Sequence, residues 1–254
     1  MEPPCSPEPV EGERERAGCL RRLKPEKSGD VLSLAVWAEK RKIMIGIVDY
    51  RAGNLTSVAR ALESLNEPCI ITNDSRLLDD VSHIIFPGVG AAGAAMANLR
   101  ESGLDGHLKK WVQNGKPVLG ICLGTQVIFD RSEEDDAPCL GIVPGVVKRF
   151  PADLREGGER LKIPHMGWNR VAFRKDHPVF AGIPEDAEFY FVHSYYPAPA
   201  DETWAAGWTD YGIRFCSAVA RGNLVAVQFH PEKSGRPGLN LLANFCRWGG
   251  SDAQ

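Results

Sequence analysis

One cysteine of this sequence lies in a setting that favours nucleophilic chemistry. Seven cysteines are spread over the 254 residues, but only Cys122 lies between two glycines in the pattern Gly-x-Cys-x-Gly, formed with Gly120 and Gly124. We expect a buried strand over 117–121 to enter this pattern and a helix over 124–129 to leave it. Small flanking residues permit the tight turn, and free N–H groups at a helix start favour a thiolate. The pattern predicts a nucleophile elbow; a buried core cysteine is the alternative for so short a motif.

A nucleophilic cysteine needs a base and a group that orients the base. Of the six histidines, His230 closes the apolar run 224–229 and is followed two residues later by Glu232. This carboxylate can lean back to the imidazole and select its tautomer. His193 is the rival base, since it also ends an apolar stretch, but no carboxylate follows it at short range. We therefore predict that His230 is the base and Glu232 its orienting group.

A glycine-rich loop follows another predicted strand and can be interpreted in two ways. Residues 88–93 match G-x-G-x-x-G, the dinucleotide fingerprint, which suggests an NAD-dependent oxidoreductase. However, the loop does not follow the first strand, and the next strand ends at Cys122 instead of an acid. Alternatively, backbone N–H groups of Gly88, Val89 and Leu123 form an oxyanion hole for a tetrahedral intermediate.

The elements around these residues predict a single α/β domain. Predicted strands alternate with helices in the first half of the domain: strands 45–49, 69–72, 83–86 and 117–121, and helices 57–65, one after Gly93, and 106–114. Such alternation indicates a largely parallel sheet flanked by helices on both faces. The second half reads mainly as strands, over 145–150, 169–173, 188–192, 217–220 and 224–229, before a last helix over 238–248. We therefore expect a mixed central sheet.

Composition excludes several classes of protein. The net charge of −3 argues against a nucleic-acid surface, and no apolar run is long enough to span a bilayer. The odd, scattered cysteines argue against a disulfide framework or a zinc site and favour the cytoplasm. Residues 1–43 are rich in Pro, Glu and Arg, which predicts a disordered extension with a stray helix over 31–39, or a true start at Met44. The domain itself is expected over 44–254.

Taken together, these motifs resemble the class I, triad-type glutamine amidotransferases. The elbow with Gln126 and the His-x-Glu motif match that family. More narrowly, the chain is similar to the glutaminase subunits of imidazole glycerol phosphate synthases. That similarity rests on five blocks in order: 47–50 with 53–54, 87–90, 164–169, 191–195 and 228–234.

The resemblance implies a fold, a reaction and a partner. It implies a class I glutamine amidotransferase-like fold in which Cys122, His230 and Glu232 hydrolyse glutamine to glutamate and ammonia. The ammonia would pass to a (β/α)₈-barrel cyclase that makes imidazole glycerol phosphate and aminoimidazole carboxamide ribotide in histidine biosynthesis. No metal or organic cofactor is implied. The alternatives are a glutaminase subunit of another amidotransferase and a non-catalytic scaffold.

The resemblance also assigns further residues. Glutamine would be bound by Gln126 and Glu134 together with backbone groups of Ser194 and Tyr195. The cyclase would be contacted by five residues: Asn54, Ser57, Trp168, Tyr190 and Lys233. For Trp168, packing in the core is the alternative to a contact with the partner.

Overall fold

The computed structural model describes residues 44–174 and 176–251. The predictions made for residues 1–43, including the helix over 31–39, lie outside the described residues.

An eight-stranded sheet forms the centre of the molecule, in the order β11-β14-β15-β16-β4-β3-β1-β2. Five neighbouring strands run parallel: β16 (Leu224–Val227), β4 (Val118–Cys122), β3 (His83–Gly88), β1 (Ile45–Val48) and β2 (Cys69–Thr72). The first four are buried along their whole length, as expected for short apolar runs covered on both faces.

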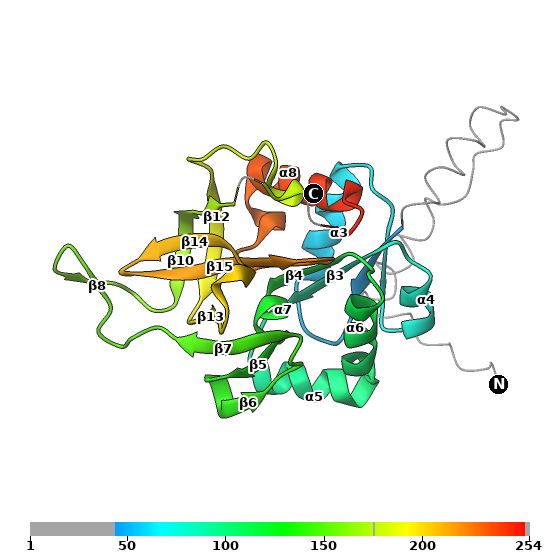
Figure 1. Ribbon diagram of the computed structural model, residues 1–254, viewed down its shortest axis with the longest axis horizontal. Helices are drawn as coiled ribbons and strands as arrows, with labels where there is room; N and C mark the ends of the chain where they lie inside the picture. Colours follow the sequence, from blue (N-terminus) through cyan, green and yellow to red (C-terminus); the bar gives the residue numbers. More distant parts are fainter. Residues whose placement is uncertain (1–43, 175, 252–254) are drawn as a thin grey trace, which may run out of the picture.

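Helices cover both faces of the parallel half (Figure 1). On one face, α3 (Leu55–Ser64) and α8 (Gly235–Arg247) pack their apolar sides into a cluster with Ile45, Ile121 and Val227. On the other face, α4 (Ser75–Asp79), α5 (Ala92–Ser102) and α6 (Leu104–Gln113) pack on a second cluster. This arrangement confirms the predicted single α/β domain.

The second half of the chain extends the sheet with antiparallel strands, so the central sheet is mixed, as predicted. β15 (Ile213–Arg221) pairs antiparallel with β16, β14 (Ala205–Tyr211) with β15, and β11 (Ala172–Phe173) with β14. A smaller sheet, β13-β7-β5-β6, contains β13 (Tyr195–Pro199), β7 (Val143–Arg149), β5 (Phe129–Ser132) and β6 (Ala137–Pro138). Two strand pairs complete the fold: β10 (His165–Arg170) with β12 (Glu188–His193), and β8 (Arg155–Glu156) with β9 (Glu159–Arg160).

Two predicted elements differ from the structure. The helix expected over 124–129 is the single turn α7 (Leu123–Gln126), because Phe129 already begins β5 and pairs with Val143. The strand expected over 169–173 is divided between β10 and β11, which pair with different strands. In both places a pairing distant in sequence overrides the local pattern.

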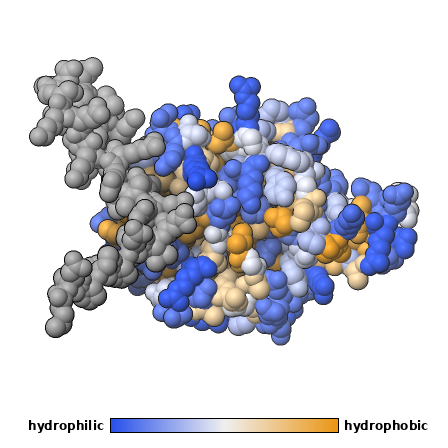
Figure 2. All heavy atoms as spheres, turned by 180° about the vertical axis from the view of Figure 1, so that it is seen from behind, coloured by the Kyte–Doolittle hydropathy of each residue, from blue (hydrophilic) through white to orange (hydrophobic). Residues whose placement is uncertain are grey.

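The surface seen in Figure 2 is mostly hydrophilic, with hydrophobic residues in small separate areas. Large hydrophobic side chains that are exposed include Met166 and Trp168 on β10, Val89 after β3, and Leu77 on α4. Among the described residues, no helix has the length and apolar character needed to cross a membrane.

Candidate active site

The topology brings the predicted nucleophile, base and oxyanion loop to one edge of the sheet. β3, β4 and β16 are parallel neighbours, so their carboxyl ends lie together. Gly88 pairs with Cys122 across β3 and β4, and Val227 pairs with Ile121 across β16 and β4. His230 follows three residues after Val227. Such an edge of an open α/β sheet is where these folds bind ligands.

Cys122 occupies a strained turn between β4 and α7. Its backbone angles are φ 54° and ψ −109°, in a region that residues with side chains rarely adopt. A Cβ on Gly124 would overlap the carbonyl oxygen of Phe86, and one on Gly120 would lie 2.9 Å from Cβ of Ala226. Both flanking glycines are therefore needed for the close approach, as the elbow motif predicts.

His230 and Glu232 form a buried pair beside this turn. Nδ1 of His230 lies 2.8 Å from Oε1 of Glu232, and each side chain is only 2% exposed. The backbone around the ring is fixed as well: His230 N–H donates to the carbonyl of Tyr190, and Ser234 Oγ donates to the carbonyl of His230. Since a carboxylate accepts, Nδ1 carries the proton and Nε2 is left to face the reaction.

The surroundings favour a protonated His230. Burial lowers the pKa of this imidazole, but interactions with Cys122 and Glu232 outweigh burial and raise the pKa to about 9. The contact with Cys122 is incomplete, because Nε2 has no partner at full hydrogen-bond geometry among the described residues. Catalytic hydrogen bonds are often this loose before substrate binds.

The rival base His193 is occupied by structural hydrogen bonds. Its Nδ1 lies 2.8 Å from the carbonyl oxygen of Tyr195, and its Nε2 lies 3.0 Å from Nδ1 of His165. Both ring nitrogens are thus engaged, and the ring is buried. The arrangement favours His230 over His193 as the base.

The glycine loop packs directly against the elbow. A Cβ on Gly88 would overlap the Tyr50 hydroxyl and lie 3.0 Å from Cβ of Leu123 and 3.1 Å from the nitrogen of Gly124. Val89, the next residue, is 43% exposed. The backbone groups assigned to an oxyanion hole therefore lie beside the nucleophile, as that interpretation requires.

The residues assigned to glutamine binding form contacts with one another and with the loops. Oε2 of Glu134 accepts from the N–H of Ala92 at 2.8 Å, and burial raises the pKa of this carboxyl. Nε2 of Gln126 donates to the Tyr195 carbonyl at 3.1 Å, and the Ser194 carbonyl accepts from the N–H of Phe150 at 3.1 Å. These side chains and carbonyls are held in place before any substrate binds.

Three residues assigned to the partner interface lie together near His230. Tyr190 is in ring contact with Trp168, at 6.0 Å between centroids, and Nζ of Lys233 lies 6.0 Å from the centroid of the Tyr190 ring. Trp168 is 55% exposed, which excludes the alternative of core packing. Asn54 and Ser57 lie at the start of α3, where the Asn54 side chain accepts from the N–H of Ser57 and caps the helix.

Three further residues of this region were not identified from the sequence. Gln228 is fully buried beside Cys122, Tyr50 places its hydroxyl against Gly88, and Met166 is exposed near Trp168. Gln228 lies in the block 228–234, two residues before His230. Its position in this motif could therefore have indicated that it belongs to the site.

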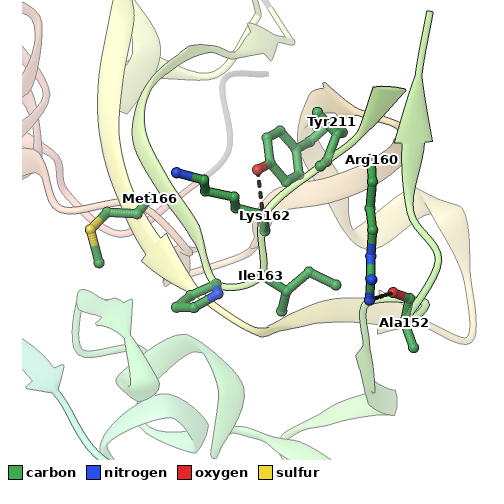
Figure 3. A pocket seen from close by; sticks show the side chains of 8 residues that line it. Ala152, Arg160, Lys162, Ile163, Met166 and Tyr211 are labelled. Carbon is green, nitrogen blue, oxygen red and sulfur yellow. Dashed lines mark hydrogen bonds between the residues drawn. The ribbon is translucent and has the colours of Figure 1, made fainter. Parts of the chain in front are cut away.

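A separate hollow lies beside the start of β10 (Figure 3). Its lining includes Arg160, Lys162, Met166 and Tyr211, and the Tyr211 hydroxyl donates to the carbonyl of Lys162 at 2.7 Å. The Tyr211 ring also stacks on His165, at 4.0 Å between centroids. Over residues 44–174 and 176–251, no cluster of three or more His, Cys, Asp and Glu side chains could hold a metal ion.

Comparisons with known proteins agree with this site. The family described as glutamine amidotransferase class-I matches residues 46–248. The chain is 53% identical over 206 residues to the imidazole glycerol phosphate synthase subunit HisH of Nitratidesulfovibrio vulgaris (strain DP4), covering 81% of this chain and 96% of that protein. It is 49% identical over 208 residues to the corresponding subunit of Aromatoleum aromaticum, covering 80% and 98%.

Solved structures support the same fold. A crystal structure of a glutamine amidotransferase aligns with a TM-score of 0.62 at 18% identity, covering 80% of this chain and 99% of that one. The structure of PurLQS from Thermotoga maritima aligns with a TM-score of 0.58 at 17% identity, covering 81% and 98%. The dinucleotide interpretation of residues 88–93 is therefore wrong. The chain belongs to the class I glutamine amidotransferase family and, within it, to the HisH subunits of imidazole glycerol phosphate synthase.

Proposed function

We propose that this chain hydrolyses glutamine to glutamate and ammonia and delivers the ammonia to a cyclase partner. One observation carries the proposal: His230 interacts with Cys122 at the elbow, and its Nδ1 is held 2.8 Å from Oε1 of Glu232. A nucleophile, a base and an orienting carboxylate in this order are the parts that amide hydrolysis requires.

Acylation begins with the Cys122 thiolate attacking the carboxamide carbon of glutamine. A C–S bond forms, and the carbonyl oxygen takes the negative charge. Backbone N–H groups of Gly88, Val89 and Leu123 are proposed to hold this oxyanion. Imidazolium His230 then gives its proton to the departing nitrogen, so the C–N bond breaks and ammonia leaves.

Deacylation uses the same histidine in the opposite sense. Neutral His230 takes a proton from water, and the resulting hydroxide attacks the glutamyl thioester. The C–S bond breaks, glutamate is released and the thiolate returns with the imidazolium. Glu232 stabilises the imidazolium at both stages, and no metal or organic cofactor enters these steps.

Glutamine recognition is assigned to a small set of polar groups. The carboxylate of Glu134 provides a counter-charge for the substrate ammonium, and its burial favours pairing with such a charge. Oε1 of Gln126 and backbone groups of Ser194 and Tyr195 are proposed to complete the recognition of the polar ends of glutamine.

The proposed partner is the (β/α)₈-barrel cyclase, which would use ammonia to form imidazole glycerol phosphate and aminoimidazole carboxamide ribotide. Support comes from the relatives, which are named as subunits of imidazole glycerol phosphate synthase. Met166 and Trp168 are two residues apart in β10, so their side chains lie on the same face of the strand. They are 62% and 55% exposed and give this face an apolar surface. We assign the interface to this side together with Tyr190, Lys233 and the start of α3, which carries Asn54 and Ser57.

The catalytic unit is proposed to occupy residues 44–254. β1 begins at Ile45 and is a strand of the central sheet, and the family match begins at residue 46. The buried core of the domain therefore begins at this strand. We expect this unit to work in the cytoplasm.

The test is glutamate release from glutamine, measured with the chain alone and with its cognate cyclase. Cys122→Ala should abolish glutamate release, while the complex keeps synthesis driven by added ammonium, because cyclisation occurs on the partner. Cys139→Ala is the matched control and should keep both activities, since Cys139 lies on the loop after β6. Glutamate release that survives in Cys122→Ala would show that another nucleophile acts.

A further inference from the structure

A run of hydrogen bonds connects strand β10, through the last residue of β12, to Tyr195 at the start of β13. Nδ2 of Asn169 lies 3.3 Å from Nε2 of His165, and Nδ1 of His165 lies 3.0 Å from Nε2 of His193. Nδ1 of His193 lies 2.8 Å from the carbonyl oxygen of Tyr195. Both histidines are buried, at 3% and 5% exposure.

From the Tyr195 carbonyl the run continues to the nucleophile. Nε2 of Gln126 donates to this carbonyl at 3.1 Å and to Oε1 of Gln228 at 3.0 Å. Nε2 of Gln228 lies 3.8 Å from Sγ of Cys122, within the longer range of hydrogen bonds to sulfur. Gln228 has no exposed surface, so water cannot replace these partners.

The chemistry of each group determines the direction of every bond. A carbonyl oxygen only accepts, so Nδ1 of His193 carries a hydrogen and its Nε2 accepts from Nδ1 of His165. Nε2 of His165 then accepts from the Asn169 amide, which is a donor at its nitrogen. Burial keeps both imidazoles neutral by lowering the pKa of His165 to about 4 and of His193 to about 3.

The same reasoning determines the orientation of the Gln228 amide. The Tyr195 carbonyl requires the nitrogen of Gln126 to point toward it, and the second hydrogen on that nitrogen is directed to Gln228. Gln228 must therefore present its oxygen to Gln126, which leaves its NH₂ group facing Sγ of Cys122. A glutamine turned the other way would place oxygen against the sulfur and nitrogen against nitrogen.

We infer that Gln228 stabilises the Cys122 thiolate through its amide N–H, and that Gln126, His193 and His165 are positioning residues that hold this amide in the donating orientation. The inference deepens the proposed glutaminase function and rests on it for its effect on turnover. A hydrogen bond to a charged acceptor is stronger than one to a neutral acceptor, so this donor favours the ionised sulfur.

The alternative is that Gln228 only satisfies polar groups inside the core. Such a role predicts a loss of stability on substitution but no selective effect on the charge of the thiol. A readout specific to the thiolate separates the two roles, since iodoacetamide reacts with the thiolate and not with the thiol.

The primary experiment is the pH dependence of iodoacetamide alkylation at Cys122, followed by peptide mass spectrometry on the full chain in complex with its cyclase. Gln228→Glu keeps the shape and the oxygen that faces Gln126 but replaces the donor. It should raise the pH of half-maximal alkylation by about one unit, which is a tenfold loss of thiolate at pH values well below this midpoint. At high pH, where alkylation has levelled off, its rate should equal that of the unmodified sequence, because access to the sulfur is unchanged.

Gln228→Met provides a second, uncharged variant and should shift the alkylation profile in the same direction. Gln113→Glu, at the exposed end of α6, adds the same charge far from the site and should leave the profile unchanged. For the positioning residues, His193→Phe should also raise the pH of half-maximal alkylation, but by less than Gln228→Glu does. His193→Gln restores a donor at this position and should therefore reverse part of that shift.

Turnover gives the second readout. Gln228→Glu should lower kcat for glutamine about tenfold with KM within twofold, and synthesis from added ammonium should not change. An unshifted alkylation profile in folded Gln228→Glu and Gln228→Met would overturn the inference. By contrast, absence of glutamate release by the unmodified complex would overturn the proposed function and leave the alkylation result standing.

Discussion

At the residue scale, the charge state of His230 determines how the site begins its cycle. Its pKa of about 9 means that the ring is protonated at neutral pH, where it faces the sulfur of Cys122. The imidazolium is the acid that ammonia needs on departure, and it is already present before glutamine binds. The carboxylate of Glu232, 2.8 Å away and equally buried, is one cause of this charge state.

We therefore expect the rate of glutamate release to fall on the alkaline side as His230 loses its proton. With the cyclase present, kcat/KM should decline above about pH 9, because the acid for the leaving group is lost. Glu232→Gln removes one of the interactions that raise this pKa. In this variant, the pH above which kcat/KM declines should be lower by at least about one pH unit. Any loss of rate would be a separate effect.

The measurement is kcat/KM for glutamate release between pH 6 and 10.5, with synthesis from added ammonium measured at each pH as the control for the partner. An alkaline limb that stays in place in Glu232→Gln would contradict the role given to this carboxylate.

Tyr50 illustrates a buried polar atom that lacks a partner. Its side chain is 1% exposed, its hydroxyl has no hydrogen-bond partner among the described residues, and burial raises its pKa. Removing such a hydroxyl removes a desolvation cost without breaking a bond. Tyr50→Phe should therefore raise the free energy of unfolding by about 1 kcal/mol.

Urea unfolding of matched variants tests this prediction. Tyr211→Phe is the comparison, because the Tyr211 hydroxyl donates to the carbonyl of Lys162 at 2.7 Å. It should lower the free energy of unfolding by about 1 kcal/mol. Equal effects of the two substitutions would mean that the Tyr50 hydroxyl has a partner in solution, such as an ordered water.

At the element scale, the elbow depends on how closely α7 approaches β3. Gly124, in α7, has no space for a Cβ because the carbonyl oxygen of Phe86 in β3 occupies that position. The obstacle is backbone of a central strand, which cannot move without disturbing the sheet. Gly124→Ala should therefore lower the free energy of unfolding by about 3 kcal/mol and displace Cys122.

Gly106→Ala is the matched control for this substitution. Gly106 lies in α6, and among the described residues no atom beyond its chain neighbours and its own helix backbone lies within 4 Å of the position of an alanine Cβ. Alanine therefore only restricts the unfolded chain and favours the helix. It should raise the free energy of unfolding by about 0.5–1 kcal/mol. Thermal unfolding of both variants at one pH decides the prediction, which fails if Gly124→Ala is no less stable than Gly106→Ala.

At the scale of the whole molecule, the stability depends on pH because buried histidines have pKa values that are shifted in opposite directions. The pKa values of His165 and His193 are lowered to about 4 and about 3, whereas that of His230 is raised to about 9. Below about pH 6.5, the unfolded chain takes up protons that His165 and His193 do not take up in the fold. Stability is therefore lost as the pH falls from about 6.5 toward 4.

His230 acts in the opposite direction. Its contribution is fully present below about pH 6.5 and is lost as the pH rises toward 9, because the folded state then retains a proton that the unfolded chain has released. Each histidine contributes a slope of up to about 1.4 kcal/mol per pH unit. The free energy of unfolding should thus be greatest near pH 6.5.

Urea midpoints between pH 4.5 and 9 measure this profile. The double variant His165→Phe/His193→Phe should flatten the acid side, although His83, whose pKa burial also lowers, keeps part of the slope. If the free energy of unfolding falls as steeply on the acid side in the double variant as in the unmodified sequence, His165 and His193 are not the cause of this loss.

Features that are local in the chain could be predicted from the sequence alone. The elbow around Cys122 needs small neighbours on either side, and His230 and Glu232 are two residues apart, so both patterns appear in the sequence. Buried strands and amphipathic helices follow local periodicity, and this was enough for the α/β class and the mixed sheet. The family followed from these same motifs.

Which residues distant in sequence come into contact could be seen only in the folded molecule. β16 pairs with β4, although more than 100 residues separate them, and this pairing brings Gln228 and His230 to Cys122. The hydrogen bonds of His193 mark it as structural, and Gln228 acquires its position beside the sulfur from contacts with Gln126. Pairing across a sheet depends on the packing of the complete core, which no short stretch of sequence specifies.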